Sequence, residues 1–198
     1  MSEKLLRALA KIVESWRVTA ETLTLWHGGD LDTTQDYIAH RGGRWEYGPG
    51  LYLTTHYDTA KKYAKGSRKL YRVVVRKGID LPDANIKMDA VKDFVNVCVI
   101  KSKRKDVLER LTKHAKGSSL NGEIFVNVMV NEEAVKNTDT GKLREFLVRN
   151  GVDYAIVDNA FGWHERMVVV FNMDAVISKT IVKPSEEIKE FDLPTNFG

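Results

Sequence analysis

Apolar residues recur every three or four positions at the start of the chain, which is typical of an amphipathic helix. Over residues 3–19 the apolar positions are Leu5, Leu6, Leu9, Ile12, Val13 and Trp16, with Lys, Arg and Glu residues between them. We therefore expect an N-terminal helix, taken as residues 1–20.

Short apolar runs rich in β-prone residues predict the strands. These runs cover residues 23–27, 51–55, 71–75, 154–157, 167–171 and 175–182, and most end at glycine or charged residues. We expect Asp58 to cap a helix that carries Ala60, Tyr63 and Ala64. A further helix is expected over 142–150, with Gly151 as its C-terminal cap.

Residues 85–140 have the weakest pattern. We expect a helix over 106–116, a strand over 123–130 and a helical turn over 131–135. Because strands outnumber helices near the motifs and their spacing is irregular, the predicted fold class is α+β. We expect a single domain over 1–198, in which 85–140 is a variable insertion suited to target recognition and 184–198 is an acidic tail.

The composition narrows the class of protein. The chain has 198 residues, 43% of them hydrophobic, which is enough for one full core. It contains no apolar run long enough to span a membrane and no signal peptide, so we expect a cytoplasmic protein without a membrane contact. Cys98 is the only cysteine, which excludes an intramolecular disulfide; within its apolar surroundings we expect a buried apolar role.

Positive charge is concentrated in one segment. The net charge is +4, but the basic segment, Lys101 to Lys116, carries seven Lys and Arg against Asp106 and Glu109, a balance of +5. Such a cluster can contact phosphates or an acidic protein face, or it can be a solvated helix surface. No aromatic residue lies between these charges to stack on bases, so a protein partner is favoured over nucleic acid.

Three polar residues stand beside predicted strands and carry the candidate chemistry. His27 follows Leu25-Trp26 and precedes Gly28-Gly29; Tyr52 lies in Gly50-Leu51-Tyr52-Leu53-Thr54; Glu165 precedes the apolar run 167–171. Taken singly, each residue has a structural interpretation, as a strand cap, a strand aromatic or a solvated charge. Their order and spacing, with Tyr63 eleven positions after Tyr52, favour a functional one.

These motifs resemble the diphtheria-toxin-like, His-Tyr-Glu class of ADP-ribosyltransferases, in particular the small bacterial and phage members. In that family the first strand ends in His-Gly, a later strand carries Gly-[Ile/Leu]-Tyr, a helical tyrosine follows eleven residues on, and a glutamate opens a late strand. The resemblance implies a split β-sheet core with the N-terminal and other helices around it. It also implies that NAD⁺ is bound as a substrate, with no metal.

The chemistry of NAD⁺ cleavage suits these residue types. Tyr52 and Tyr63 can stack on the cationic nicotinamide ring, and Gly28 lets the carboxamide approach the backbone because it has no Cβ. His27 can donate to a ribose hydroxyl. Bond cleavage builds positive charge on the ribose, which the Glu165 carboxylate would stabilise. By the resemblance, Glu165 also binds the 2′-hydroxyl and activates the acceptor.

The sequence departs from the family pattern at one position. The family has a serine three residues before the helical tyrosine, where this chain has Ala60, and we expect the neighbouring Thr59 to substitute for it. Thr54 and Thr59 complete the expected NAD⁺-binding set. His164 and Arg166 flank Glu165, and either can pair with its carboxylate or face away.

Other site classes lack their motifs. The Glu-x-Glu triplet of the Arg-Ser-Glu transferases is missing, as are a Rossmann Gly-x-Gly-x-x-Gly after a strand and any His or Cys spacing typical of metal ligands. The predicted activity is transfer of a single ADP-ribose from NAD⁺ to a macromolecule, with release of nicotinamide. The alternatives are a non-catalytic protein that binds NAD⁺ or ADP-ribose or inhibits a partner, and an RNA 2′-phosphotransferase-like activity, which would need basic residues around the pocket.

Overall fold

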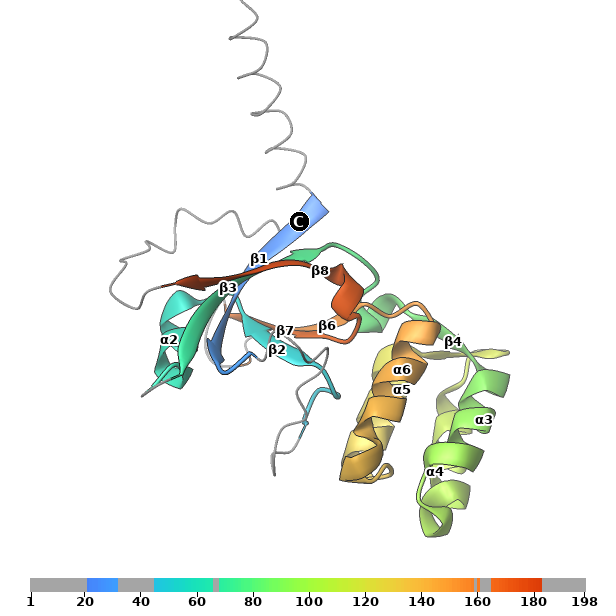
Figure 1. The fold of residues 1–198 in the computed structure, drawn as a ribbon. Coiled ribbons are helices and arrows are strands. Elements are labelled where there is room, and N and C mark those ends of the chain that lie inside the picture. The colour runs from blue at the N-terminus through green and yellow to red at the C-terminus, as the bar shows by residue number, and fades with distance from the viewer. Residues whose placement is uncertain (1–20, 32–44, 66–67, 159, 161–164, 183–198) are drawn as a thin grey trace, which may run out of the picture. The chain divides into compact units, whose positions relative to one another are not determined.

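The computed structural model describes residues 21–31, 45–65, 68–158, 160 and 165–182. These residues form an α+β fold with five α-helices, a six-stranded antiparallel sheet and a two-stranded sheet, which confirms the predicted class (Figure 1). The expected N-terminal helix over 1–20 and the acidic tail over 184–198 lie outside the described residues.

The strands and helices follow one another without a regular repeat. The strands are β1 (Thr22–Gly29), β2 (Leu51–Thr54), β3 (Lys69–Arg76), β4 (Asn85–Lys87), β5 (Ser119–Asn121), β6 (Tyr154–Asp158), β7 (Arg166–Val170) and β8 (Val176–Val182). The helices are α2 (Tyr57–Tyr63), α3 (Met88–Cys98), α4 (Arg104–His114), α5 (Gly122–Asn131) and α6 (Thr140–Arg149). The large sheet has the strand order β6-β7-β2-β1-β3-β8, and β4 pairs with β5 in the small one.

Two compact units make up the chain. The first contains the described residues of Met1–Asp30, Thr54–Lys77 and Ala175–Gly198, and the second contains those of Leu31–Leu53 and Gly78–Asp174. The strand β2 crosses this division, because only its last residue, Thr54, belongs to the first unit. A single domain over the whole chain stays a prediction.

In the first unit, α2 packs on β1. The side chains of Trp26, Tyr57, Ala60, Leu70 and Val182 form its buried cluster, and the rings of Trp26 and Tyr57 meet edge to face with centroids 5.1 Å apart. The expected cap at Asp58 is wrong: α2 begins at Tyr57 with His56 as its N-cap, so Asp58 is the second residue of the helix. There its carboxylate lies in the first turn, where negative charge is favourable.

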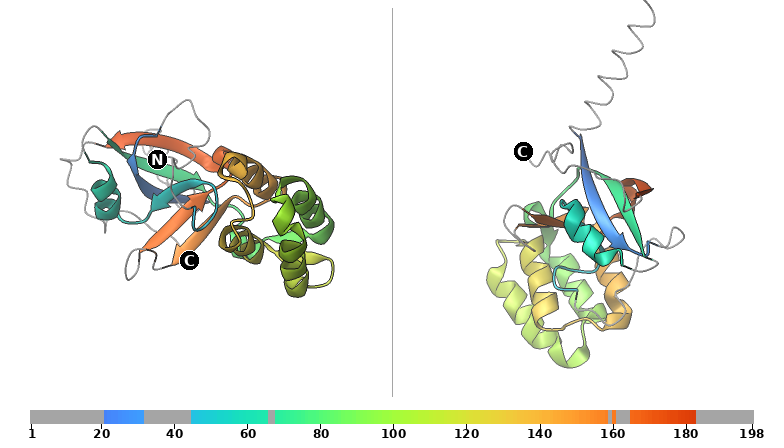
Figure 2. Two further views of the ribbon diagram at one scale, coloured as in Figure 1. Left: turned by 90° about the horizontal axis from the view of Figure 1, so that it is seen from below. Right: turned by 90° about the vertical axis from the view of Figure 1, so that its left-hand side faces the viewer.

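In the second unit, α3 to α6 lie together in all the views and enclose an apolar core (Figure 2). Three phenylalanine rings meet in it, those of the buried Phe94 and Phe125 and the partly buried Phe146, with centroids 4.6 to 5.6 Å apart. Cys98 ends α3 and packs against this core, and burial raises the pKa of its thiol. Cys98 is half-buried rather than buried as expected, but its neighbours are apolar and a raised pKa disfavours the reactive thiolate.

The predicted strand over 123–130 is wrong, because these residues belong to α5. The Asn121 side chain accepts hydrogen bonds of 2.9 and 3.3 Å from two backbone N–H groups of the first turn. Phe125, Val126 and Met129 share one buried helical face. A cap and a packed face therefore outweigh the β propensity of this valine-rich segment.

The ends of α5 and α6 have the same backbone geometry. Gly151 has a φ of +82°, and Val152 N–H donates to the Leu147 carbonyl at 3.1 Å, which confirms the predicted glycine cap. At the end of α5 the same position is taken by Glu133, with a φ of +45°. The helical turn predicted over 131–135 is therefore wrong, because the chain leaves α5 there.

The Asp80 carboxylate connects the chain before β4 to β6 by hydrogen bonds. Its Oδ1 atom accepts hydrogen bonds from the backbone N–H groups of Leu81, at 2.7 Å, and Ile156, at 3.0 Å. Beside it the Tyr154 hydroxyl donates to the Gly78 carbonyl at 3.1 Å. Burial raises the pKa of Asp80, the two N–H groups lower it, and the charges of Asp83 and Glu123 raise it further, with a net upward shift.

We predict that Asp80 makes stability depend on pH. A raised carboxyl pKa in the folded state contributes stability below the unfolded pKa of about 3.9, and this contribution is lost as pH rises through the folded pKa. Asp80→Asn keeps an acceptor oxygen without the charge, so its free energy of unfolding should fall less than that of the wild type from about pH 4 to pH 7. Asp80→Ala should lower it by about 1–3 kcal/mol at pH 7, because two N–H groups lose their acceptor.

Urea unfolding across this pH range measures both effects. Parallel pH profiles for wild type and Asp80→Asn would contradict the role given to the charge.

Candidate functional site

The residues expected to bind NAD⁺ divide between the two units. His27, Gly28, Thr54, Thr59 and Tyr63 belong to the first unit, and Tyr52 and Glu165 belong to the second. Each group is held by its own set of contacts.

At the end of β1, the absence of a side chain at Gly28 is required by helix packing. A Cβ atom on Gly28 would lie 1.7 Å from the Ala60 carbonyl oxygen of α2 and 2.9 Å from the nitrogen of Ala64, the C-cap of α2. His27 is half-buried, and its ring centroid lies 6.4 Å from that of Tyr71, its pairing partner on β3. The close approach thus brings His27 and Gly28 to the helix that carries Thr59 and Tyr63.

The helix α2 presents an aromatic ring to solvent. Tyr63 is its last residue and is 50% exposed, so its ring is accessible for stacking. Ala60, which stands where the transferases that the sequence resembles have serine, is only 1% exposed and belongs to the core of the unit. Thr54 is buried, and its Oγ1 atom accepts a 3.0 Å hydrogen bond from the backbone N–H of His56, the N-cap of α2. Thr54 therefore has a structural role at the start of α2. Thr59, one of the other expected NAD⁺-binding residues, is half-buried.

Tyr52, in the second unit, is tied to the loop that precedes its own strand. Its hydroxyl donates to the Gly48 carbonyl at 2.8 Å and accepts from the Tyr47 backbone N–H at 3.4 Å. A Cβ on Gly50 would lie 2.6 Å from the Val170 carbonyl of β7, so glycine allows the close approach of this loop to β7. The phenol is thus held in place by backbone groups.

Glu165 lies immediately before β7 and is only 5% exposed. Buried carboxylates are uncommon in proteins and mark paired or functional groups. Of its two charged neighbours, Arg166 donates from Nε to the Asp158 carboxylate at 2.7 Å, across the β6–β7 pair. His164 lies outside the described residues.

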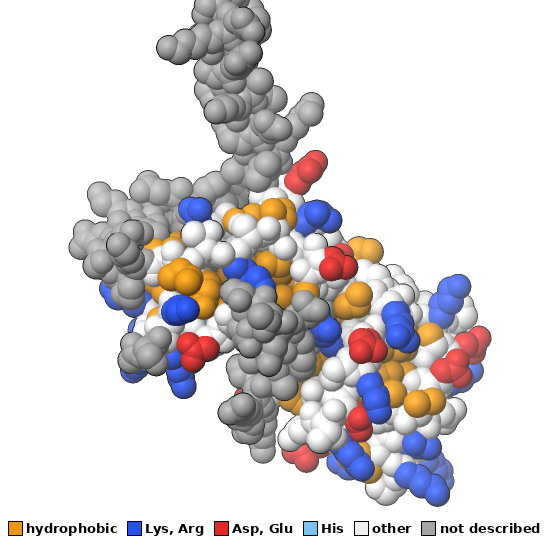
Figure 3. All heavy atoms as spheres, in the orientation of Figure 1, with side chains coloured by type: hydrophobic (Ala, Val, Ile, Leu, Met, Phe, Trp, Pro, Cys, Tyr) orange, Lys and Arg blue, Asp and Glu red, His pale blue; other side chains and the backbone are white. Residues whose placement is uncertain are grey.

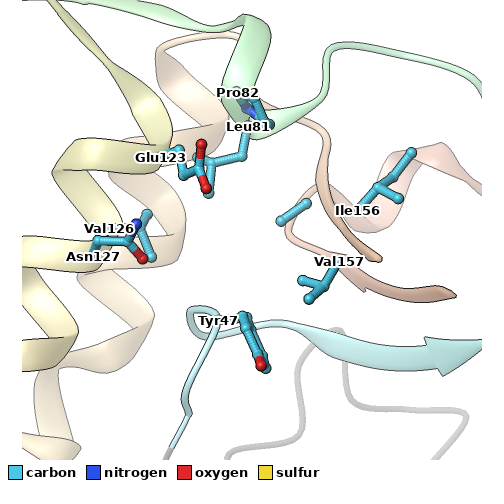
Figure 4. Close-up of a pocket in the computed structure, with 9 residues that line it drawn as sticks. Tyr47, Leu81, Pro82, Glu123, Val126, Asn127, Ile156 and Val157 are labelled. Atoms are coloured by element: carbon cyan, nitrogen blue, oxygen red, sulfur yellow. The ribbon is translucent and has the colours of Figure 1, made fainter. Parts of the chain in front are cut away.

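A pocket in the second unit was not foreseen from the sequence. Its walls are Tyr47 from the loop before β2, Leu81 and Pro82, then Glu123, Val126 and Asn127 of α5, and residues 155–157 of β6 (Figure 4). It has a cavity volume of about 40 Å³. Glu123 and Asn127 are one helical turn apart, whereas on the predicted strand the same spacing would separate them by about 13 Å.

A second, more open hollow in this unit has a volume of about 290 Å³. It lies along α6 and the chain after β7, and its charged lining residues are Arg144, Arg149, Glu145 and Asp174. The Arg144 guanidinium donates to the Phe171 carbonyl, and Arg149 pairs with Glu145. Because these opposite charges balance, the hollow favours neither an anion nor a cation.

The basic segment is less strongly charged toward solvent than its composition indicates. Lys103 and Arg104 donate to backbone carbonyls, and Arg110 and Lys113 form ion pairs with Glu132 and Glu109. Lys101, Lys105 and Lys116 are exposed and form no ion pair with a described residue. Acidic side chains are interspersed among the basic ones on the helical face seen in Figure 3.

Among the described residues there is no group of three or more His, Cys, Asp or Glu side chains that could hold a metal ion. None of the described helices has the length and apolarity needed to cross a membrane. Comparisons with protein-family models, with curated proteins and with solved structures found no match.

Gly28→Ala is predicted to lower the free energy of unfolding by about 2–3 kcal/mol, because the new methyl group meets the backbone of α2 and the helix must move. Gly141→Ala on α6 is the matched control, since a Cβ there meets nothing within 4 Å. The control should be neutral or raise stability by up to about 1 kcal/mol. Urea unfolding compares the two, and equal effects would contradict the steric account.

For Tyr52→Phe, we expect a loss of about 1 kcal/mol in the free energy of unfolding, because the hydroxyl gives up two backbone partners. Tyr47→Phe removes a hydroxyl that makes no hydrogen bond with a described residue, so it should cost less. Thermal or urea unfolding of both variants measures the difference. If Tyr47→Phe costs as much, the loop is not held by the Tyr52 phenol.

Proposed function

We propose that the protein transfers a single ADP-ribose from NAD⁺ to an acceptor protein, with release of nicotinamide. The observation that supports this proposal best is the strand order of the large sheet. The strands β7, β2 and β1 are consecutive in it, and each carries or adjoins one of the three signature residues, Glu165, Tyr52 and His27. In the chain Glu165 is more than a hundred positions from Tyr52 and His27, whereas in the sheet the strand that follows Glu165 is consecutive with theirs.

Each residue has a distinct task in the proposed reaction. Tyr63, with its exposed ring, and Tyr52 stack on the nicotinamide while it is still cationic. His27 donates to a ribose hydroxyl and orients the cofactor. Glu165 stabilises the positive charge that develops on the ribose, and its burial favours this task because a carboxylate acts more strongly where water is excluded.

A protein acceptor is favoured over nucleic acid. Only three lysines of the basic segment are exposed without an ion pair to a described residue, and the exposed Asp106 and Glu109 belong to the same segment. Nucleic-acid binding draws on many unpaired cations and on aromatic stacking. If nucleic acid were the acceptor, its affinity would fall steeply with salt.

The test of the proposal is nicotinamide release from NAD⁺. Glu165→Gln keeps the size of the side chain but removes its charge, and should slow release at least about tenfold, because the developing positive charge loses its partner. Tyr52→Ala should slow it similarly through loss of stacking. Glu109→Gln on α4 is the control, since it removes an exposed carboxylate whose ion-pair partner among the described residues is Lys113, and should leave the rate unchanged.

Calorimetry with NAD⁺ distinguishes the proposal from the non-catalytic alternative. Saturable binding without nicotinamide release would identify a protein that binds NAD⁺ or ADP-ribose and would contradict the transferase. Unchanged release in Glu165→Gln would also contradict it.

A further inference from the structure

The pocket of the second unit is small, which limits what it can hold. A water molecule needs about 10–15 Å³ of such space, so a volume of about 40 Å³ admits roughly three water-sized groups. A purine ring or a dinucleotide is too large for it. The head of one amino-acid side chain fits.

The charge of the pocket favours a cation. Of the described residues that line it, only Glu123 is charged, and no described Lys or Arg forms an ion pair with it. Asp80 and Asp83 add negative charge nearby, as shown by the effect of Asp83 and Glu123 on the pKa of Asp80. A field of one sign at a cleft draws groups of the opposite sign.

The walls of the pocket distinguish between cations. Leu81, Val126 and Ile156 are apolar, Tyr47 lines one side with its ring pointing away from the other labelled residues, and Glu123 and Asn127 are exposed on α5 (Figure 4). A guanidinium group is planar and weakly hydrated, and it donates several hydrogen bonds in one plane. An ammonium group is strongly hydrated, so entering an apolar pocket costs it more.

We infer that this pocket binds the guanidinium group of an arginine side chain on the acceptor protein. That the arginine belongs to an acceptor rests on the proposed function; the pocket itself does not. Glu123 pairs with the guanidinium, and the Asn127 side-chain oxygen accepts from it. The pocket adjoins candidate site residues within the same unit, because the Tyr47 backbone donates to the Tyr52 hydroxyl and β6 pairs with β7, which follows Glu165.

Butylguanidinium and butylammonium, which differ only in the head group, are the probes. Titrated into the full chain and followed by NMR, butylguanidinium should shift the amide signals of Tyr47 and Asn127 with saturation, and butylammonium should bind at least about fivefold more weakly. Glu123→Gln should weaken butylguanidinium binding about tenfold, as expected for loss of a charged hydrogen-bond partner. Asn127→Ala should weaken it to a smaller extent.

Glu133→Gln is the matched control, because it removes an exposed carboxylate just beyond the other end of α5. It should leave butylguanidinium affinity unchanged. Equal binding of the two probes, no saturable binding, or equal effects of Glu123→Gln and Glu133→Gln would each overturn the inference. An unfolding curve for every variant verifies that it is folded.

Nicotinamide release, measured in the same samples, separates this inference from the proposed function. Butylguanidinium binding without release would support the pocket and refute the transferase. Release without butylguanidinium binding would refute the pocket and leave the transferase standing.

Discussion

The second unit depends on one partly buried carboxylate. Asp80 lies where the chain leaves the sheet for the helical segment, and a single oxygen accepts N–H groups from both sides of that junction, Leu81 and Ile156. Burial makes the charge costly, which is seen in the raised pKa of Asp80, but the backbone groups would be costlier still without an acceptor. Because Leu81 and Ile156 both line the pocket, the same carboxylate also joins two of its walls.

The sequence predicted the strands of the large sheet well and the middle of the chain poorly, for a physical reason. Strands such as β3 are short apolar runs with charged or glycine ends, and this signal is local. The helix α5 has a strand-like composition, and two features outside that composition make it helical: the Asn121 cap before it and the phenylalanine core beneath it. Asn121 was not identified as a cap from the sequence, and the packing partners come from α3 and α6.

The residue types of the candidate site could be predicted from the sequence. The structural role of some of these residues could not. The order of His27-Gly28, Tyr52 and Glu165 was visible, and so was their position at strands. Gly28 was interpreted as making room for a cofactor, whereas its missing Cβ makes room for the backbone of α2. This close contact between Gly28 and α2 depends on which helix covers which strand. The spacing of residues along the chain does not predict that arrangement.

One loop contacts both the pocket and the candidate site residue Tyr52 in the second unit. The loop over 45–50 contributes Tyr47 to the wall of the pocket and two backbone groups to the Tyr52 hydroxyl, so neither can move far without the other. An arginine side chain bound against this wall would restrict the loop and thereby fix the Tyr52 ring, which the proposed reaction needs against the nicotinamide. The ligand that binds first loses the conformational entropy of ordering this loop, and the second ligand then loses less. Acceptor and NAD⁺ would therefore bind with positive cooperativity.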